Sequence, residues 1–542
     1  MADWYVRPDT SHSGTRDGLS YETAWGGWLA VVWGASGVKS SDTLYVCGTH
    51  LITEGITIGN HGATNEAGRV TVSGAYAADP GAFTVSVSGN VFITNTRNYT
   101  TLDSLTITAN ASNALYLYAN PTLTGMTIQG CTFYGGTGAA IIGLSAATGQ
   151  TYVDFTVTDN DFIGGSGSPL GGAITWTVAA SGLPVGTLTR VTIHNNRFTE
   201  CQAERAVVQL RMESGGSLSS TMSDIVITDN VFRDCPTLGM EIVGPSLTGN
   251  PSYYGVNTGI RITGNKFYDM TNTSAEFNLG GAMGIGGFGP SLTSGFGANI
   301  IARNEAYGLT GPSGFLNTFY GTYRVFDNYG EDIIASQADG NAILIDHGCK
   351  DCVVYSNHFK RVIGHIDAEN SGCGVMILDA ENTTVYGNVF DGCKIGIYVG
   401  NKKEVAQSSN VYNNTFLNCS LAGVLFLSTA DKTTHLIRNN ILTSANEANS
   451  VQVAGGGWTG ESNNAFHSFG SAVGHTVQAP HLGVDPELDS DYRPHSAVHK
   501  RTGTYLGGKD LNGKHFYDPP NLGGVDELTT TPRYGFKSTQ AA

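Results

Sequence analysis

The stretch "TTVYGNVFDGC" at 383–393 decides the fold, because "IVITDNVFRDC" at 225–235 nearly repeats it. In both, a run of β-branched and aromatic residues leads to an Asn, one further residue and a Phe. The phrase also occurs at 155–162, 191–198 and 410–416, with weaker copies elsewhere. The aligned residues are Asn160, Asn196, Asn230, Asn265, Asn304, Asn328, Asn357, Asn388, Asn414, Asn440 and Asn464. A phrase that returns after about 24 to 39 residues predicts a solenoid built from one coil per copy.

Each repeat also carries a second apolar run, such as "GMEIV" (239–243) or "GVMILD" (374–379), and helical periodicity is absent. Coils made of several short strands can stack with equivalent strands about 4.8 Å apart. We therefore predict an all-β chain that forms a parallel β-helix over 41–466. An N-terminal cap at 1–40 and a C-terminal capping or oligomerisation segment at 467–542 would enclose it.

The repeated residues should form columns along this solenoid. We expect each repeated Asn to adopt the left-handed turn conformation and to hydrogen-bond to the Asn of the next coil. The Phe that follows should enter the core. A Cys lies three residues after the repeated Phe at Cys201, Cys235, Cys393 and Cys419. We interpret these as small buried residues, although neighbouring coils would also permit disulfides.

Composition excludes several classes of protein. Only 14% of the 542 residues are charged, yet 40% are apolar, which excludes wholesale disorder. The net charge is −16 and no Lys/Arg-rich run occurs, so we expect neither nucleic-acid nor anionic-membrane binding. No apolar run is long enough for membrane insertion, and the first residues do not predict a signal peptide.

The Asn-containing repeat, the opening "WYVRPDTSHSG" and the late segment "VDPELDSDYRPHSAV" (484–498) together resemble the right-handed parallel β-helix, or pectin-lyase-like, superfamily. Within it the chain resembles bacteriophage tailspikes and polysaccharide depolymerases. This resemblance implies a right-handed solenoid, a homotrimer, and loop-lined grooves that bind bacterial capsule or lipopolysaccharide. The superfamily's galacturonan-hydrolase acids and its Asp-rich calcium cluster are not evident, so we expect no metal and no cofactor.

Two acids end similar apolar runs. "NAILID" ends at Asp346 and "GVMILD" at Asp379, and alignment of the runs places both acids at one position of successive coils. Carboxylates stacked in this way are close enough for the catalytic pair of a retaining glycoside hydrolase. His347 and Glu381 lie beside them, and His347 is a substrate-binding candidate. Alternatively, each Asp caps the turn after its strand.

A second candidate is Glu241, which interrupts an apolar run and aligns with Val207 and Met283. A lone acid on an apolar ladder is unexpected, so Glu241 is a candidate general acid, with Glu213 or an insert residue such as Glu276 as its catalytic partner. Long inserts between about 160 and 300 carry aromatic residues such as Phe288 that suit sugar rings. The remaining substrate-binding candidates are Arg211, Arg261, Tyr253, Tyr254 and Glu276. Alternatively, the charges form a surface salt-bridge network and the aromatics pin their own loops.

These observations leave three functions open. The first is a phage tailspike or receptor-binding protein on the virion, attached through a baseplate or tail adaptor. It would bind and depolymerise a bacterial surface polysaccharide over coils between about 200 and 380, with hydrolysis favoured over elimination and both reactions left open. The second is a secreted bacterial polysaccharide lyase or glycoside hydrolase. The third is an adhesin that binds glycan without cleaving it.

Overall fold

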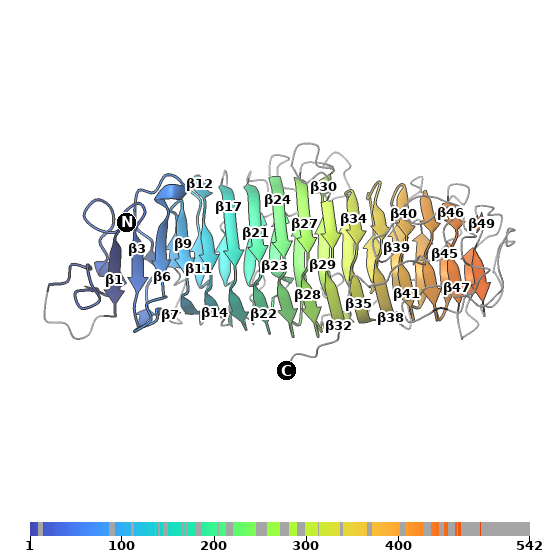
Figure 1. Cartoon of the computed structure of the whole chain (residues 1–542), viewed down its shortest axis with the longest axis horizontal. Helices are drawn as coiled ribbons and strands as arrows, with labels where there is room; N and C mark the ends of the chain where they lie inside the picture. The colour runs from blue at the N-terminus through green and yellow to red at the C-terminus, as the bar shows by residue number, and fades with distance from the viewer. Residues whose placement is uncertain are drawn as a thin grey trace. The chain divides into compact units, whose positions relative to one another are not determined.

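The computed structural model of the chain divides into two compact units, Met1–Asn299 and Ile300–Ala542. It describes residues 1–8, 15–85, 93–109, 113–135, 137–138, 141–144, 150–164, 166–167, 172–178, 186–203, 205–212, 221–244, 257–271, 281–289, 299–312, 314–336, 340–365, 371–400, 408–426, 435–443, 449–453, 461–462, 464–467 and 488. In each unit the strands of successive coils pair in parallel, which confirms the predicted right-handed parallel β-helix (Figure 1).

A coil contributes a strand to each of three sheets, called sheets 1, 2 and 3 in chain order. In unit 1, sheet 1 contains β1 (Asp3–Arg7), β2 (Trp25–Gly26), β3 (Thr43–Val46), β6 (Val70–Ser73), β9 (Thr100–Asp103), β12 (Thr122–Thr124), β13 (Thr127–Gln129), β17 (Thr151–Thr158), β21 (Thr187–His194), β24 (Thr221–Thr228), β27 (Asn257–Thr263) and β30 (Phe288–Gly289). Sheet 2 contains β4 (Thr49–Ile52), β7 (Ala82–Val85), β10 (Thr106–Ala109), β14 (Thr132–Tyr134), β18 (Asp161–Ile163), β22 (Arg197–Thr199), β25 (Val231–Arg233) and β28 (Lys266–Tyr268). Sheet 3 contains β5 (Ile56–Thr57), β8 (Ile93–Asn95), β11 (Leu115–Leu117), β16 (Ile142–Leu144), β20 (Ile174–Val178), β23 (Ala206–Met212), β26 (Leu238–Val243) and β29 (Gly281–Gly286).

Unit 2 repeats this plan. Sheet 1 contains β31 (Asn299–Ala302), β34 (Tyr323–Phe326), β37 (Val353–Tyr355), β40 (Thr383–Tyr386), β43 (Ser409–Tyr412), β46 (His435–Arg438) and β49 (Glu461–Ser462). Sheet 2 contains β32 (Glu305–Gly311), β35 (Tyr329–Ala335), β38 (His358–Ile363), β41 (Val389–Asp391), β44 (Thr415–Leu417), β47 (Ile441–Thr443) and β50 (Ala465–His467). Sheet 3 contains β33 (Leu316–Phe319), β36 (Ile343–Ile345), β39 (Cys373–Leu378), β42 (Ile395–Gly400), β45 (Ala422–Phe426) and β48 (Asn449–Val453).

The remaining elements are small. β15 (Thr137–Gly138) pairs with β19 (Ser166–Gly167), and the described residues also form two 3₁₀ helices, η1 (Trp28–Ala30) and η2 (Glu66–Gly68). No helix in the described ranges has the length and apolar character needed to cross a membrane. The predicted boundaries of the cap and of the C-terminal segment stay predictions, and almost all of 467–542 lies outside the described residues.

The repeated Asn residues form the predicted column at the turn between sheets 1 and 2. The side-chain amide of Asn388 donates to Asn414 Oδ1 at 2.9 Å, and Asn414 donates to Asn440 Oδ1 at 3.1 Å. Asn388 also donates to the carbonyl oxygens of Val354 and Tyr386, while its Oδ1 accepts from Asn357. Each buried Asn therefore satisfies polar groups of its own coil and of both neighbouring coils.

One detail of this prediction is wrong. The left-handed conformation belongs to the residue before each ladder Asn, as φ values of 58° at Asp229, 63° at Gly387 and 54° at Asn413 show. The chain bends at this earlier residue, which lets the side chain of the following Asn point into the column. Turn-forming residues occupy both positions in the sequence, so composition could not distinguish their roles.

Aromatic and Cys residues form the inner columns. In unit 1, Phe162, Phe198 and Phe232 stack with ring centroids 4.8 and 4.7 Å apart. In unit 2, Phe390 and Phe416 stack at 5.4 Å. All nine Cys residues are buried and free, which agrees with their interpretation as small ladder residues.

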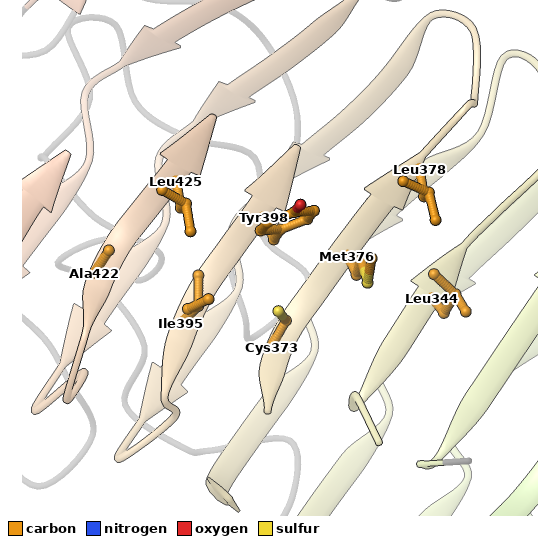
Figure 2. Packing of buried hydrophobic residues seen from close by; sticks show 8 residues of the cluster. All are labelled: Leu344, Cys373, Met376, Leu378, Ile395, Tyr398, Ala422 and Leu425. Carbon is orange, nitrogen blue, oxygen red and sulfur yellow. The ribbon is translucent and has the colours of Figure 1, made fainter. Parts of the chain in front are cut away.

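Sheet 3 of unit 2 is buried on both faces. Every residue of β39 and β42 is buried, and Figure 2 shows their apolar side chains in rows across neighbouring strands. The cluster contains Leu344, Cys373, Met376, Leu378, Ile395, Tyr398, Ala422 and Leu425. Strands buried on both sides read as continuous apolar runs without alternation. A single chain therefore buries this face without a partner.

The buried His358 gives unit 2 a predicted pH dependence. Burial lowers its pKa from 6.5 to about 4. Between these values the unfolded chain binds a proton that the folded chain does not, so stability falls as the pH falls. We expect a loss of about 3 kcal/mol in unfolding free energy between pH 6.5 and 4 from this residue.

Denaturant unfolding across this pH range tests the expectation. Replacement of His358 with Asn should flatten the pH slope. The same change at His194, whose side chain is 44% exposed, is the control for removal of an imidazole outside the core. An unchanged slope in the His358 variant would contradict the assignment.

Candidate functional site

A polar cluster lies at the ends of the sheet 3 strands of unit 2. Asp346 and His347 follow β36, Asp379 follows β39, and Tyr320 follows β33. Backbone bonds extend the sheet through these residues, since the Tyr320 amide donates to the His347 carbonyl at 2.9 Å. The Gly348 amide likewise donates to the Asp379 carbonyl at 3.2 Å. Three successive coils thus hold the cluster in place.

His347 contacts both acids. Its Nδ1 hydrogen-bonds to Asp346 Oδ1, and its backbone amide donates to the same oxygen at 2.7 Å. Its Nε2 lies 3.7 Å from Asp379 Oδ2. The side chains of Asp346 and Asp379 are 12% and 2% exposed, whereas that of His347 is 26% exposed. The imidazole is therefore the member of this cluster that a substrate can reach most easily.

The predicted stacking of the two acids is wrong by one residue. Ile345 pairs with Ile377, which sets Asp346 level with Leu378 and His347 level with Asp379. The two carboxylates do not share a position in successive coils, but they meet the same imidazole. Because both faces of these strands are apolar, the sequence contains no alternation that would fix the register.

The surroundings of the cluster are partly buried. Burial, with a smaller contribution from the charge of Asp346, raises the pKa of the Tyr320 phenol, so it stays protonated.

Glu381, which the sequence places near the acids, pairs with Lys350 at 3.1 Å. This hydrogen bond raises the pKa of the exposed Lys350 amine. Glu381 is thus engaged with a cation in this structure.

Glu241 lies in a second cluster, in unit 1. Its carboxylate accepts hydrogen bonds from Arg205 Nε and Nη2 at 3.1 and 3.0 Å and from Arg211 Nη1 at 2.7 Å. The Glu241 side chain is 8% exposed. Both guanidinium groups direct their N–H donors at this one carboxylate, an arrangement typical of a structural ion pair. The contacts form an ion-pair cluster, as in the alternative interpretation, but its carboxylate is buried and does not lie at the surface.

The predicted neighbours of Glu241 are corrected by the strand register. Gln209 and Gly284 lie level with it, in place of Val207 and Met283. Arg211 contacts Glu241 from the neighbouring strand β23. Arg261 lies in β27 of sheet 1, so it does not join this cluster in sheet 3.

Several predicted residues cannot be placed. Glu213, Tyr253, Tyr254 and Glu276 lie outside the described residues. Phe288 is described and is fully buried in β30, so it offers no surface to a sugar. Of the candidates, Asp346, His347 and Asp379 are brought together, and Arg211 with Glu241 forms a separate group.

Two family models match parts of the chain. A model described as right handed beta helix region matches residues 89–278, and one described as periplasmic copper-binding protein (NosD) matches residues 317–470. A search of curated proteins finds no match. The first model agrees with the strand registers, which show a right-handed parallel β-helix fold.

The donor groups of unit 2 do not fit a copper site. Among the described residues, no group of three or more His, Cys, Asp or Glu side chains is arranged to hold a metal ion. Burial raises the pKa of the Cys349 and Cys373 thiols, which disfavours the thiolate that binds soft metals.

Similar solved structures include a PL6 alginate lyase in complex with a trisaccharide, at 10% identity and a TM-score of 0.46, with 88% of this chain and 94% of that chain covered. The pectate lyase Pel9A aligns over 97% of both chains, at 13% identity and a TM-score of 0.24. The catalytic domain of a GH87 α-1,3-glucanase in complex with nigerose aligns over 88% of this chain and 68% of its own, at 12% identity and a TM-score of 0.31.

Proposed function

We propose that this chain binds a polysaccharide and cleaves its glycosidic bonds at the cluster of Asp346, His347 and Asp379. The observation that carries this proposal is an accessible imidazole between two buried carboxylates. An imidazole in such a place can hold a proton near neutral pH and transfer it to a leaving oxygen.

Each residue has a proposed role. Asp346 is a positioning residue, because its bond to Nδ1 fixes the ring and leaves Nε2 for the reaction. Asp379 places negative charge 3.7 Å from Nε2 and so favours the imidazolium. His347 is the catalytic residue, which passes the Nε2 proton to the glycosidic oxygen while the carbon–oxygen bond breaks.

Two reactions are compatible with an imidazole that exchanges a proton at this place, and they differ in whether His347 starts protonated or neutral. In hydrolysis, the hydroxyl of a water replaces the leaving oxygen on the sugar carbon, and the second water proton returns to His347. In elimination, a neutral His347 takes the proton from the carbon beside a sugar carboxyl and delivers it to the leaving oxygen as a double bond forms. Two-carboxylate hydrolysis needs carboxyl groups about 5–9.5 Å apart on either side of the bond. Here both acids converge on one ring, so we give elimination equal weight to the hydrolysis expected from the sequence.

Product analysis separates these reactions. The protein would be incubated with a panel of bacterial surface polysaccharides. New reducing ends report either reaction, whereas near-ultraviolet absorbance of unsaturated uronate reports elimination alone. If glycans are bound but none is cleaved, the adhesin interpretation replaces this proposal.

We infer the biological setting from the sequence. A low charge and a chain built almost wholly of coils favour a phage tailspike on the virion, with capsule or lipopolysaccharide as its ligand. A secreted or periplasmic bacterial enzyme is the alternative, and the periplasmic family description of residues 317–470 is consistent with it.

A homotrimer is the assembly that we predict. Large apolar side chains are exposed at the N-terminal end of unit 1, with Leu29 at 75%, Leu51 at 66% and Leu19 at 59% exposure. Such residues are candidates for burial between chains. Light scattering at micromolar concentration should give three times the mass of the chain. A stable monomer would remove this prediction and favour the secreted enzyme.

A further inference from the structure

The outer side of sheet 1 in unit 2 carries a column of aromatic rings. Phe326, Tyr355, Tyr386 and Tyr412 stack on successive strands β34, β37, β40 and β43, with centroids 4.8, 5.2 and 5.1 Å apart. All four side chains are half-buried, and Arg438 of β46 follows Tyr412 in the column. Because the rings cover one another, they present their edges, and the Tyr hydroxyls, as one row.

A hollow adjoins the end of this row. It has a volume of about 270 Å³. Its lining consists of Thr384, Asn410, Val411, Tyr412, Leu436 and Arg438. Hydroxyl, amide and guanidinium groups thus line it beside apolar side chains, a mixture typical of a site that orients a small polar group.

Arg438 has no counter-charge in the described part of the chain. Its guanidinium makes no hydrogen bond or ion pair there, and its Nε is shielded from solvent without a partner. By contrast, Arg190, Arg197 and Arg361 each pair with a carboxylate. A partly buried guanidinium without a partner is costly unless an anion occupies the space beside it.

The Tyr hydroxyls remain hydrogen-bond donors at any physiological pH. Burial raises the pKa values of Tyr355 and Tyr412 to about 12, and it also raises that of Tyr386. At the other end of the row, Arg324 is exposed and forms no ion pair with a described residue. The carboxylate of Asp327 lies near that end and would repel an anion. The end at Arg438 is therefore the more favourable one for an anion.

We propose that the strip formed by Tyr355, Tyr386, Tyr412 and Arg438 binds an anionic oligosaccharide, with a sugar carboxylate or sulfate in the hollow at Arg438. A linear chain of repeated sugar units matches a surface that repeats once per coil, since each unit meets an equivalent phenol. A lone phosphate would use the hollow but not the row. The strip lies on sheet 1 and the His347 cluster on sheet 3, so this site does not depend on the proposed reaction.

The test is a calorimetric titration of full-length protein carrying His347→Gln, which prevents turnover during the measurement. The probes are oligogalacturonates, sulfated chondroitin oligosaccharides and neutral malto-oligosaccharides of matched length. We expect an acidic probe to bind more tightly than the neutral one, with an affinity that falls as salt rises.

Substitutions in the same background assign the site. Arg438→Gln should weaken binding of the acidic probe by about tenfold or more, because a charge-assisted hydrogen bond is lost. Arg438→Lys should retain part of the affinity, and Tyr412→Phe should cost about threefold. Arg233→Gln, the same charge change on sheet 2 of unit 1, serves as the control and should stay within about twofold.

The proposal fails if neither acidic probe binds, if the neutral probe binds as well, or if Arg438→Gln leaves the affinity unchanged. If a His347 variant of the native chain loses cleavage but still binds the acidic probe, the proposal that the strip binds an anionic oligosaccharide is unaffected. If Arg438→Gln loses binding but still cleaves short substrates at the normal rate, the proposal of catalysis at His347 is unaffected.

Discussion

Replacement of His347 with Gln should lower the rate of polysaccharide cleavage by about 100-fold or more while glycan binding is retained. Gln keeps a polar side chain at this position but cannot exchange a proton with a glycosidic oxygen. A loss of this size lies within the range for a general acid–base group, and both buried carboxylates act on this one ring. The measurement is the initial rate of reducing-end release at saturating substrate.

Matched variants separate catalysis from folding. Asp346→Asn keeps the shape of the positioning residue and should lower the maximal rate less than His347→Gln, with little change in KM. Asp379→Asn should shift the pH profile of the rate, because the imidazolium loses its nearby charge. His194→Gln alters an exposed histidine on sheet 1 of unit 1 and should leave the rate within about threefold. A rate within threefold of the parent for His347→Gln would refute the proposed role.

Replacement of Asn388 with Ala should lower the unfolding free energy by about 4 kcal/mol or more. The change removes donors to Val354, Tyr386 and Asn414 and the acceptor for the Asn357 amide. Each buried polar group left without a partner costs about 1–3 kcal/mol, and several are left here. Denaturant titration followed by circular dichroism measures the effect.

The control is Asn410→Ala on the outer, half-buried side of β43. This Asn lies on a strand of sheet 1 and is not part of the column, so its loss should cost about 0.5 kcal/mol or less. Asn388→Asp adds a second test, because it keeps the shape of the side chain but places a charge in the column. If Asn388→Ala were as mild as Asn410→Ala, the column would contribute little to stability.

The repeat alone predicted the architecture, because a stacked solenoid requires the same residue at the same place in each coil. The repeat alone therefore predicts that Asn388 and Asn414 are neighbours, and that Phe390 and Phe416 are neighbours. Even the weak copies at Asn304 and Asn328 lie in the column, where Asn304 donates to Asn328 at 3.0 Å. Local chemistry of this kind does not depend on the number of residues between one copy and the next, which varies from about 24 to 39.

The candidate site depended on contacts that the sequence does not encode locally. The sequence marked Asp346 and Asp379 as unusual acids, but their register in a sheet buried on both faces has no alternating pattern to fix it. Only the tertiary structure placed His347 between them. Similarly, Glu241 was recognisable as an unexpected acid, whereas its pairing with Arg205 and Arg211 required the coils to be stacked.

The unpaired state of Arg438 is likewise a property of the folded chain. The sequence by itself determined the coils and their ladders, because these follow from residues that repeat along the chain. The tertiary structure decided which charges meet and which do not, because partners come from coils about 24 to 39 residues apart. A one-residue slip between such coils exchanges the neighbours of every side chain.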